Sequence, residues 1–156
     1  MSDSTAGTQD GGGAGRTLAL DYGDRRIGIA LSDELGLVAR PLMTLTRSSW
    51  PADLGKLRAL IHEHEVRRIV IGMPLDMDGG RGGRARLTET FIEKIRAATR
   101  LPVIAWDERL TTVQAERILI SGDVSRARRR TVIDQVAAVI LLQSWLDAQR
   151  AGGKTG

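Results

Sequence analysis

The stretch LALDYGDRRIGIALSD, residues 18–33, constrains the fold more than any other part of the chain. Two short apolar runs, residues 18–20 and 27–31, flank a polar turn at residues 21–26. Short apolar runs bounded by Gly and Asp predict two strands joined by a tight turn. Asp21 comes where the first strand ends, so its carboxylate either helps to form the turn or points into a cleft beside the sheet. This stretch alone leaves both interpretations open.

The rest of the chain predicts a third strand, followed by an alternation of helices and strands. Strands are expected at residues 35–45, 67–72 and 102–106, and helices at residues 50–64, 83–99, 112–120 and 131–148. Ser48 or Ser49 should cap the first helix, and a polar connector at residues 121–130 should precede the last one. Right-handed crossovers place the fourth and fifth strands parallel to the first. The predicted fold class is α/β, a mixed five-stranded sheet with its first three strands antiparallel, flanked by helices on both faces.

The composition suits one compact domain over residues 17–150, with loose tails at residues 1–16 and 151–156. No run approaches the roughly 18 apolar residues of a membrane helix. Cysteine is absent, which excludes disulfides and thiolate metal sites and fits a cytoplasmic protein. The net charge is +4, and 20 of the 23 basic residues are arginines, whose planar guanidinium suits phosphate oxygens. Nucleic acid is therefore a candidate partner.

Acidic residues are expected to meet at the edge of the sheet where α/β proteins usually bind ligands. Asp21 ends the first strand, Asp107 and Glu108 end the fifth, and Asp134 lies in the first turn of the last predicted helix. Converging carboxylates without cysteine favour Mg²⁺ or Mn²⁺, and two such ions about 4 Å apart can clamp a phosphodiester. Alternatively, Asp134 serves only the helix dipole. Alternation along a strand does not choose between Asp107 and Glu108.

Arginines lie beside these acids in the sequence. The candidate nucleic-acid-binding residues are Arg25, Arg26, Arg81, Arg109, Arg128, Arg129 and Arg130. A nuclease needs such residues, because they hold the phosphates that neighbour the scissile one. Alternatively, residues 126–130 form a solvated linker. The tryptophans Trp50, Trp106 and Trp145 are interpreted as packing residues, since aromatic residues make up only 3% of the chain.

Four motifs together resemble a known family. LDYGDRRIGIALSD, VIGMPLDMDG, WDERLTT and DVSRARRRTVIDQVAAVILLQSWLD are similar, in order and spacing, to the YqgF/RuvX family of bacterial proteins. The resemblance spans residues 17–148. It implies an RNase H-like fold, kinship with Holliday-junction resolvases, and nuclease activity on the precursor of small-subunit ribosomal RNA. It also implies Asp21, Glu108 and Asp134 as the catalytic, metal-binding acids, which favours Glu108 over Asp107.

The leading hypothesis is a metal-dependent nuclease that uses these three acids on structured RNA, in maturation of the 5′ end of pre-16S rRNA. The expected partners are nucleic acid and ribosomal precursor particles, with the protein a monomer or weak dimer and without a membrane. One alternative is a DNA-junction resolvase, which needs a dimer to cut two strands symmetrically. Another is a nucleic-acid-binding ribosome-assembly factor that scarcely cleaves. A nucleotide binder of the sugar-kinase type is disfavoured, because such proteins need two lobes.

Overall fold

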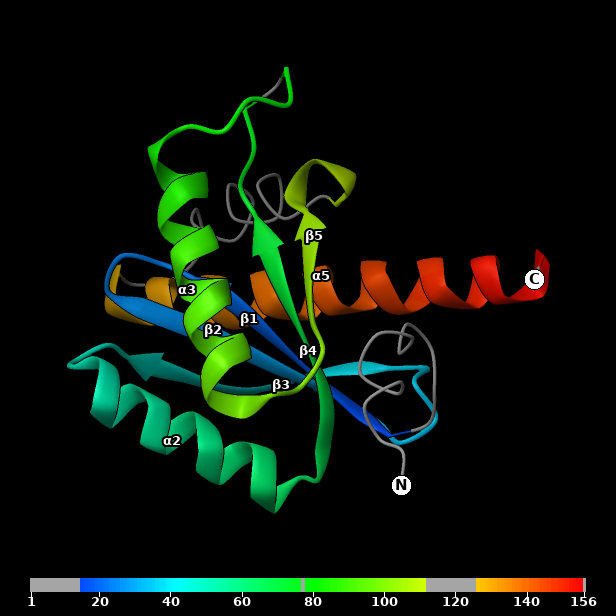
Figure 1. Ribbon diagram of the computed structural model, residues 1–156, viewed down its shortest axis with the longest axis horizontal. Coiled ribbons are helices and arrows are strands. Elements are labelled where there is room, and N and C mark those ends of the chain that lie inside the picture. The colour runs from blue at the N-terminus through cyan, green and yellow to red at the C-terminus, as the bar shows by residue number, and fades with distance from the viewer. Residues whose placement is uncertain (1–14, 77, 112–125, 156) are drawn as a thin grey trace.

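The computed structural model describes residues 15–76, 78–111 and 126–155, and its centre is a five-stranded sheet (Figure 1). The strand order is β3-β2-β1-β4-β5. The strands are β1 (Arg16–Tyr22), β2 (Arg26–Ser32), β3 (Ala39–Thr46), β4 (Val66–Met73) and β5 (Val103–Asp107). β1, β2 and β3 pair antiparallel, while β4 pairs parallel with both β1 and β5. This confirms the predicted mixed sheet with the first strand at its centre.

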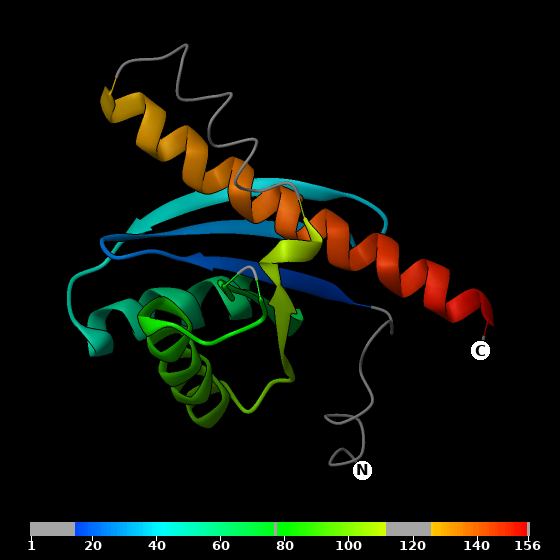
Figure 2. The ribbon, with the colours of Figure 1, turned by 90° about the horizontal axis from the view of Figure 1, so that it is seen from above.

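Helices cover both faces of the sheet, as predicted. The helices are α2 (Trp50–Glu63), α3 (Gly83–Thr99) and α5 (Arg126–Thr155), and the short 3-10 helix η1 (Glu108–Leu110) follows β5. α2 and α3 lie on one face, and α5 crosses the other (Figure 2). None of the helices in the described part of the chain is long and apolar enough to cross a membrane.

The side chains of β1 supply two separate cores, because neighbouring residues of a strand face opposite sides of the sheet. Leu18 and Leu20 are fully buried in the core beneath α2 and α3. Ala19, between them, is fully buried in the core beneath α5. Continuing this alternation places Asp21 on the α5 face and Tyr22 on the α2 and α3 face. The end of β1 therefore carries an acid on one side and an aromatic ring on the other.

Helix α2 begins where its sequence predicts. Ser49 is the N-cap, and its hydroxyl accepts a hydrogen bond of 3.3 Å from the backbone N–H of Ala52. Pro51 stands in the first turn, where its missing N–H costs nothing. Ser48 has another partner, since its backbone N–H donates to the carboxylate of Asp53 at 3.1 Å.

Several predicted boundaries are wrong. α5 begins at Arg126, not at residue 131, so the expected connector is helical from that residue on. It continues to Thr155, through most of the predicted C-terminal tail. β3 begins only at Ala39, because the segment before it is a turn in which the Asp33 carboxylate accepts from the N–H groups of Leu37 and Val38. The predicted helix at 112–120 lies outside the described residues.

Candidate functional site

Asp21 lies at the end of the central strand, in a buried position with 6% of its surface exposed. In the pairing with β2, it stands opposite Gly28. On the other side of β1, Leu20 pairs with Ile71 of β4, and the next residue of β4 is Gly72. Asp21 is therefore flanked on the neighbouring strands by two residues without side chains. By strand alternation, both glycines share the α5 face with Asp21.

The first of these glycines lets α5 rest directly on the sheet at Asp134. A Cβ atom added at Gly28 would lie 2.0 Å from the carbonyl oxygen of Asp134, far inside van der Waals contact. Only glycine allows the helix backbone to come this close to β2. The contact brings Asp134 next to the strand position that pairs with Asp21.

The second glycine provides the space for Glu108. A Cβ atom added at Gly72 would lie 2.8 Å from Oε2 of Glu108 and 3.0 Å from its Cγ. The Glu108 side chain thus lies over β4, beside the end of β1. Asp134 and Glu108 thus each lie over one of the two glycines that flank Asp21, at the same end of the sheet.

The neighbouring acid, Asp107, forms its hydrogen bonds and its ion pair with a residue of its own segment, Arg109. It caps η1 by accepting a 2.9 Å hydrogen bond from the Arg109 backbone, and it pairs with the Arg109 guanidinium at 2.7 Å. The hydrogen bonds from the Arg109 side chain hold the pKa of the Asp107 carboxyl below its usual value, and the carboxylate raises the pKa of Arg109. Asp107 and Glu108 therefore have different surroundings in the structure, a difference that strand alternation alone does not predict.

Asp134 already has a cationic partner. Its Oδ2 accepts a 2.7 Å hydrogen bond from Nε of Arg26, and both side chains are mostly buried. Three carboxylates are the donor set that Mg²⁺ or Mn²⁺ prefers, so these residues fit such an ion in kind. In the described part of the chain, however, no group of three or more His, Asp or Glu side chains is arranged to hold a metal. Among the described contacts, the cationic partner of Asp134 is Arg26.

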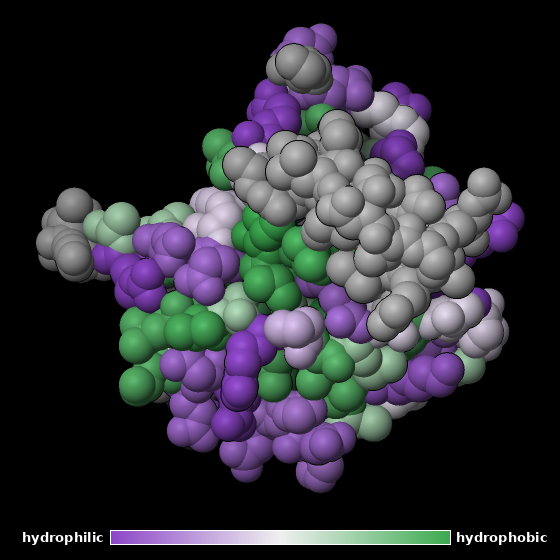
Figure 3. Space-filling model, turned by 180° about the vertical axis from the view of Figure 1, so that it is seen from behind, coloured by the Kyte–Doolittle hydropathy of each residue, from purple (hydrophilic) through white to green (hydrophobic). Residues whose placement is uncertain are grey.

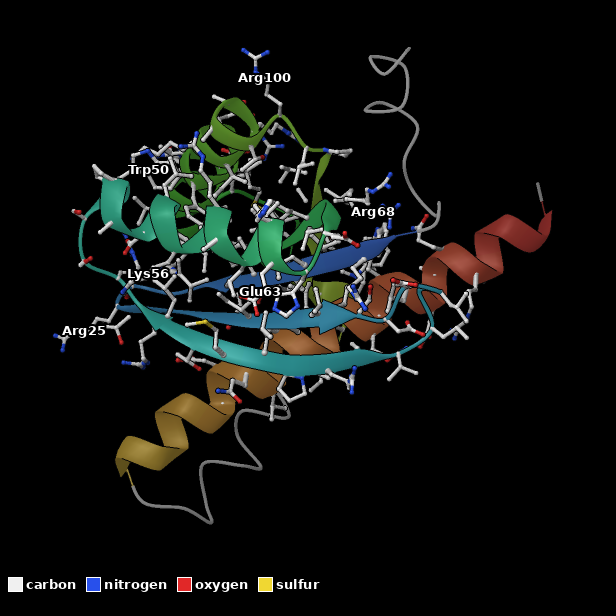
Figure 4. All side chains as sticks on the ribbon, turned by 90° about the horizontal axis from the view of Figure 1, so that it is seen from below. Arg25, Trp50, Lys56, Glu63, Arg68 and Arg100 are labelled. Carbon is white, nitrogen blue, oxygen red and sulfur yellow. The ribbon has the colours of Figure 1, made fainter. Side chains whose placement is uncertain are left out.

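The other predicted arginines differ in their exposure and in their ion-pair partners. Arg25 is exposed in the β1–β2 turn and extends away from the sheet (Figure 4). Arg81 pairs with Glu89 at 2.9 Å, and both Arg81 and Arg109 remain partly exposed. Arg128, Arg129 and Arg130 lie along the first turns of α5 rather than in a linker. The face that carries α5 mixes polar and apolar side chains instead of forming one apolar surface (Figure 3).

Two arginines hold the β1–β2 turn, and sequence reasoning did not find this role. Arg47 donates to the carbonyl oxygens of Gly23 and Asp24, at 2.8 and 2.7 Å. Arg84 donates to the Tyr22 carbonyl at 2.7 Å and forms an ion pair with Asp24. Both contacts join segments far apart in the chain, so no local pattern signals them. They clamp the turn that follows Asp21 from the α2 and α3 side.

Comparisons with known proteins identify the family of this chain. Residues 15–148 match the family described as "RuvX: Holliday junction resolvase". Two relatives carry the name "Putative pre-16S rRNA nuclease". The one from Myxococcus xanthus (strain DK1622) is 51% identical over 135 residues, covering 86% of this chain and 89% of its own. The one from Symbiobacterium thermophilum is 52% identical over 136 residues, covering 87% and 94%.

A solved structure shows the same fold. The yeast mitochondrial Holliday junction resolvase aligns with a TM-score of 0.51 at 12% identity, covering 88% of this chain and 80% of its own. The mixed sheet with its antiparallel first three strands is accordingly RNase H-like, as the sequence motifs implied. The family match over nearly the whole described chain, together with relatives about half identical to it, shows that the chain belongs to the RuvX family.

Proposed function

We propose that this protein is a metal-dependent nuclease that hydrolyses phosphodiester bonds in structured RNA, during maturation of the 5′ end of pre-16S rRNA. Its family and the names of relatives that match most of their own length support this. The observation that carries the proposal is the placement of Asp21 between Gly28 and Gly72, with Asp134 over one glycine and Glu108 over the other.

In this proposal, Asp21, Glu108 and Asp134 hold one or two Mg²⁺ or Mn²⁺ ions. A bound divalent ion supplies positive charge to the scissile phosphate and lowers the pKa of water. Arg26 neutralises Asp134, so this mostly buried carboxylate does not stand uncompensated. If a metal ion bound Asp134 in place of Arg26, the Arg26 guanidinium would be available to a phosphate oxygen of the substrate.

The remaining arginines bind the phosphates on either side. Arg25 is exposed beside the end of β1, and Arg81 and Arg109 are ion-paired at the surface, where such pairs open at little cost. Arg128, Arg129 and Arg130 add positive charge to the first turns of α5. These residues recognise the backbone and not the base sequence, so they position the strand without choosing it.

A Holliday-junction resolvase is the second candidate, because the matching family is described by that activity. It would use the same three acids on branched DNA. The two candidates differ in substrate and in the need for a dimer, and both differ from an assembly factor that binds RNA without cutting it.

The deciding experiment measures cleavage of matched RNA and DNA substrates, including a four-way junction, with Mg²⁺ and with Mn²⁺. Asp21→Asn should lower the cleavage rate by more than the roughly 10- to 100-fold typical of losing a residue that supports a metal ligand. Asp147→Asn, an exposed carboxylate elsewhere on α5, is the matched control and should cleave normally. Preference for the junction, with a dimer by light scattering, would favour the resolvase. Binding without any cleavage would reject both enzymes in favour of the assembly factor.

A further inference from the structure

A pocket lies at the same end of β1 as the acids, on the opposite face of the sheet. It is a pocket of about 280 Å³, lined by the end of β1, the segment between β3 and α2, and one side of α3. Its principal lining residues are Tyr22, Arg47, Trp50, Phe91 and Lys94. The volume is just below the roughly 300 Å³ at which small-molecule sites begin, so it suits one small planar group.

This pocket gathers most of the aromatic side chains of an aromatic-poor chain. Tyr22 and Phe91 are the only tyrosine and phenylalanine in the sequence, and Trp50 is one of three tryptophans. The Tyr22 and Phe91 rings stack with centroids 4.0 Å apart, and the Trp50 ring meets Phe91 edge-on at 6.2 Å. Phe91 is buried, whereas Tyr22 and Trp50 are only half-buried. Trp50 lies at the start of α2 (Figure 4) and lines the pocket.

Two cations stand over these rings. The Arg47 guanidinium lies 4.6 Å from the centroid of Tyr22, and the Lys94 ammonium lies 5.4 Å from the centroid of Trp50. Lys94 is exposed, so its charge faces solvent at the mouth of the pocket. Aromatic rings next to exposed cations are the combination with which proteins bind single-stranded nucleic acid, the rings stacking on bases and the cations meeting phosphates.

A buried carboxylate decides which part of a nucleotide can enter. Asp53 also lines the pocket, has 6% of its surface exposed, and accepts hydrogen bonds from the N–H and hydroxyl of Ser48. The negative charge of Asp53 would repel a phosphate placed inside the pocket. A base instead carries amino and imino groups, which can donate hydrogen bonds to a carboxylate. The pocket therefore favours a base inside and the phosphates outside, beside the exposed Lys94.

We propose that this pocket binds one unpaired base of the RNA substrate, stacked on Trp50, while the backbone of the strand continues around the β1–β2 turn to the acids. The proposal rests on the proposed function. Tyr22 directly follows Asp21, so the pocket and the acids lie on opposite faces of one strand end. Trp50, which the sequence indicated as a packing residue alone, thus also forms a binding surface.

The test measures the affinity of labelled single-stranded RNA by fluorescence anisotropy in EDTA, so that binding is separated from cleavage. A single abasic position is moved along the RNA. In the wild-type protein, one abasic position should raise the Kd by about 5- to 100-fold, the value of one base stacked on an aromatic ring. Trp50→Ala should weaken binding of intact RNA by a similar factor and abolish the abasic penalty. Trp50→Phe, which keeps a ring, should retain most of that penalty.

Lys94→Gln provides an independent arm that leaves the aromatic packing in place. It should weaken RNA binding and make its salt dependence shallower, whereas Lys56→Gln, an exposed lysine on α2 outside the pocket, should do neither. An abasic penalty of equal size in wild type and Trp50→Ala would overturn the proposal. So would competition by a nucleoside monophosphate without any sensitive abasic position, since the pocket would then hold free nucleotide.

The outcome is separable from that of the nuclease proposal. A wild-type protein that shows the position-dependent abasic penalty but cleaves nothing with Mg²⁺ or Mn²⁺ rejects the nuclease and supports the base pocket. Cleavage that depends on Asp21, without any abasic penalty, supports the nuclease and overturns the base pocket.

Discussion

Two glycines shape the candidate site, because each leaves room for a functional group from another element. Gly28 is covered by the α5 backbone at Asp134, and Gly72 by the Glu108 side chain. A side chain at Gly28 would push away the helix backbone at Asp134, and one at Gly72 would shift the Glu108 carboxylate. The positions of the acids thus depend on residues that have no chemistry of their own.

Gly28→Ala should destabilise the protein and impair cleavage together. Its methyl group would lie 2.0 Å from the Asp134 carbonyl, so α5 must shift, and overpacking of this kind costs about 1–3 kcal/mol of the free energy of unfolding. Denaturant unfolding and a cleavage assay measure both effects. Gly55→Ala is the control: an added Cβ meets nothing within 4 Å in α2, and the change should stabilise the helix by about 0.5–1 kcal/mol. Unaltered unfolding and cleavage in Gly28→Ala would contradict the close contact.

At the scale of the elements, the first turn of α2 contributes to the proposed pocket as well as to the stability of the helix. It carries Trp50 and Asp53, which line the base pocket, and it follows closely on Arg47, which holds the β1–β2 turn. The cap at Ser49 therefore sets the position of the pocket wall as well as the start of the helix.

Ser49→Ala should lower the free energy of unfolding by about 1 kcal/mol, because the N–H of Ala52 loses its acceptor. Ser49→Asp retains an acceptor and should stay close to wild type. Urea unfolding of the three proteins measures the difference. Equal stability of Ser49→Ala and wild type would show that the hydroxyl does not act as a cap.

For the molecule as a whole, α5 joins the acidic site to a basic segment. The helix spans the sheet from the arginine-rich turns at its start to Trp145, which is buried in the core against β1 and β2. Because these arginines belong to the same continuous helix as Asp134, their backbone positions relative to Asp134 are set by the helix, which a flexible linker could not do.

Replacing Arg128, Arg129 and Arg130 by Gln should weaken binding to all RNA sequences alike. The plot of log K against log salt concentration should become shallower by about 0.7 to 0.9 for each phosphate that the variant no longer neutralises. Binding measured at several salt concentrations gives this slope. The same number of exposed arginines elsewhere, Arg40, Arg58 and Arg100, forms the charge-matched control and should leave the slope nearly unchanged. Equal slopes in the two triple variants would exclude a specific contribution from α5.

Local patterns in the sequence were sufficient for the order of the strands, the start of α2 and the choice of Asp21 and Asp134 as candidates. Each depends on residues close together in the chain: an apolar run, a capping serine, an acid at a strand end. The start of α5 was misplaced because its first turns are polar and carry no apolar stripe, although arginine is a good helix former. Asp134 therefore lies deeper in its helix than predicted.

Local sequence patterns do not predict the features that are formed by packing between segments far apart in the chain. Glu108 and Asp107 are neighbours in the chain, and only the bare surface at Gly72 and the ion pair with Arg109 give them different surroundings. The rings lining the base pocket look like unrelated packing residues until β1, α2 and α3 come together. Sequence periodicity reports which side of an element is buried, but not which residue of another element it will meet. That pairing is set by the packing of the whole core, and here it forms both the acidic site and the pocket behind it.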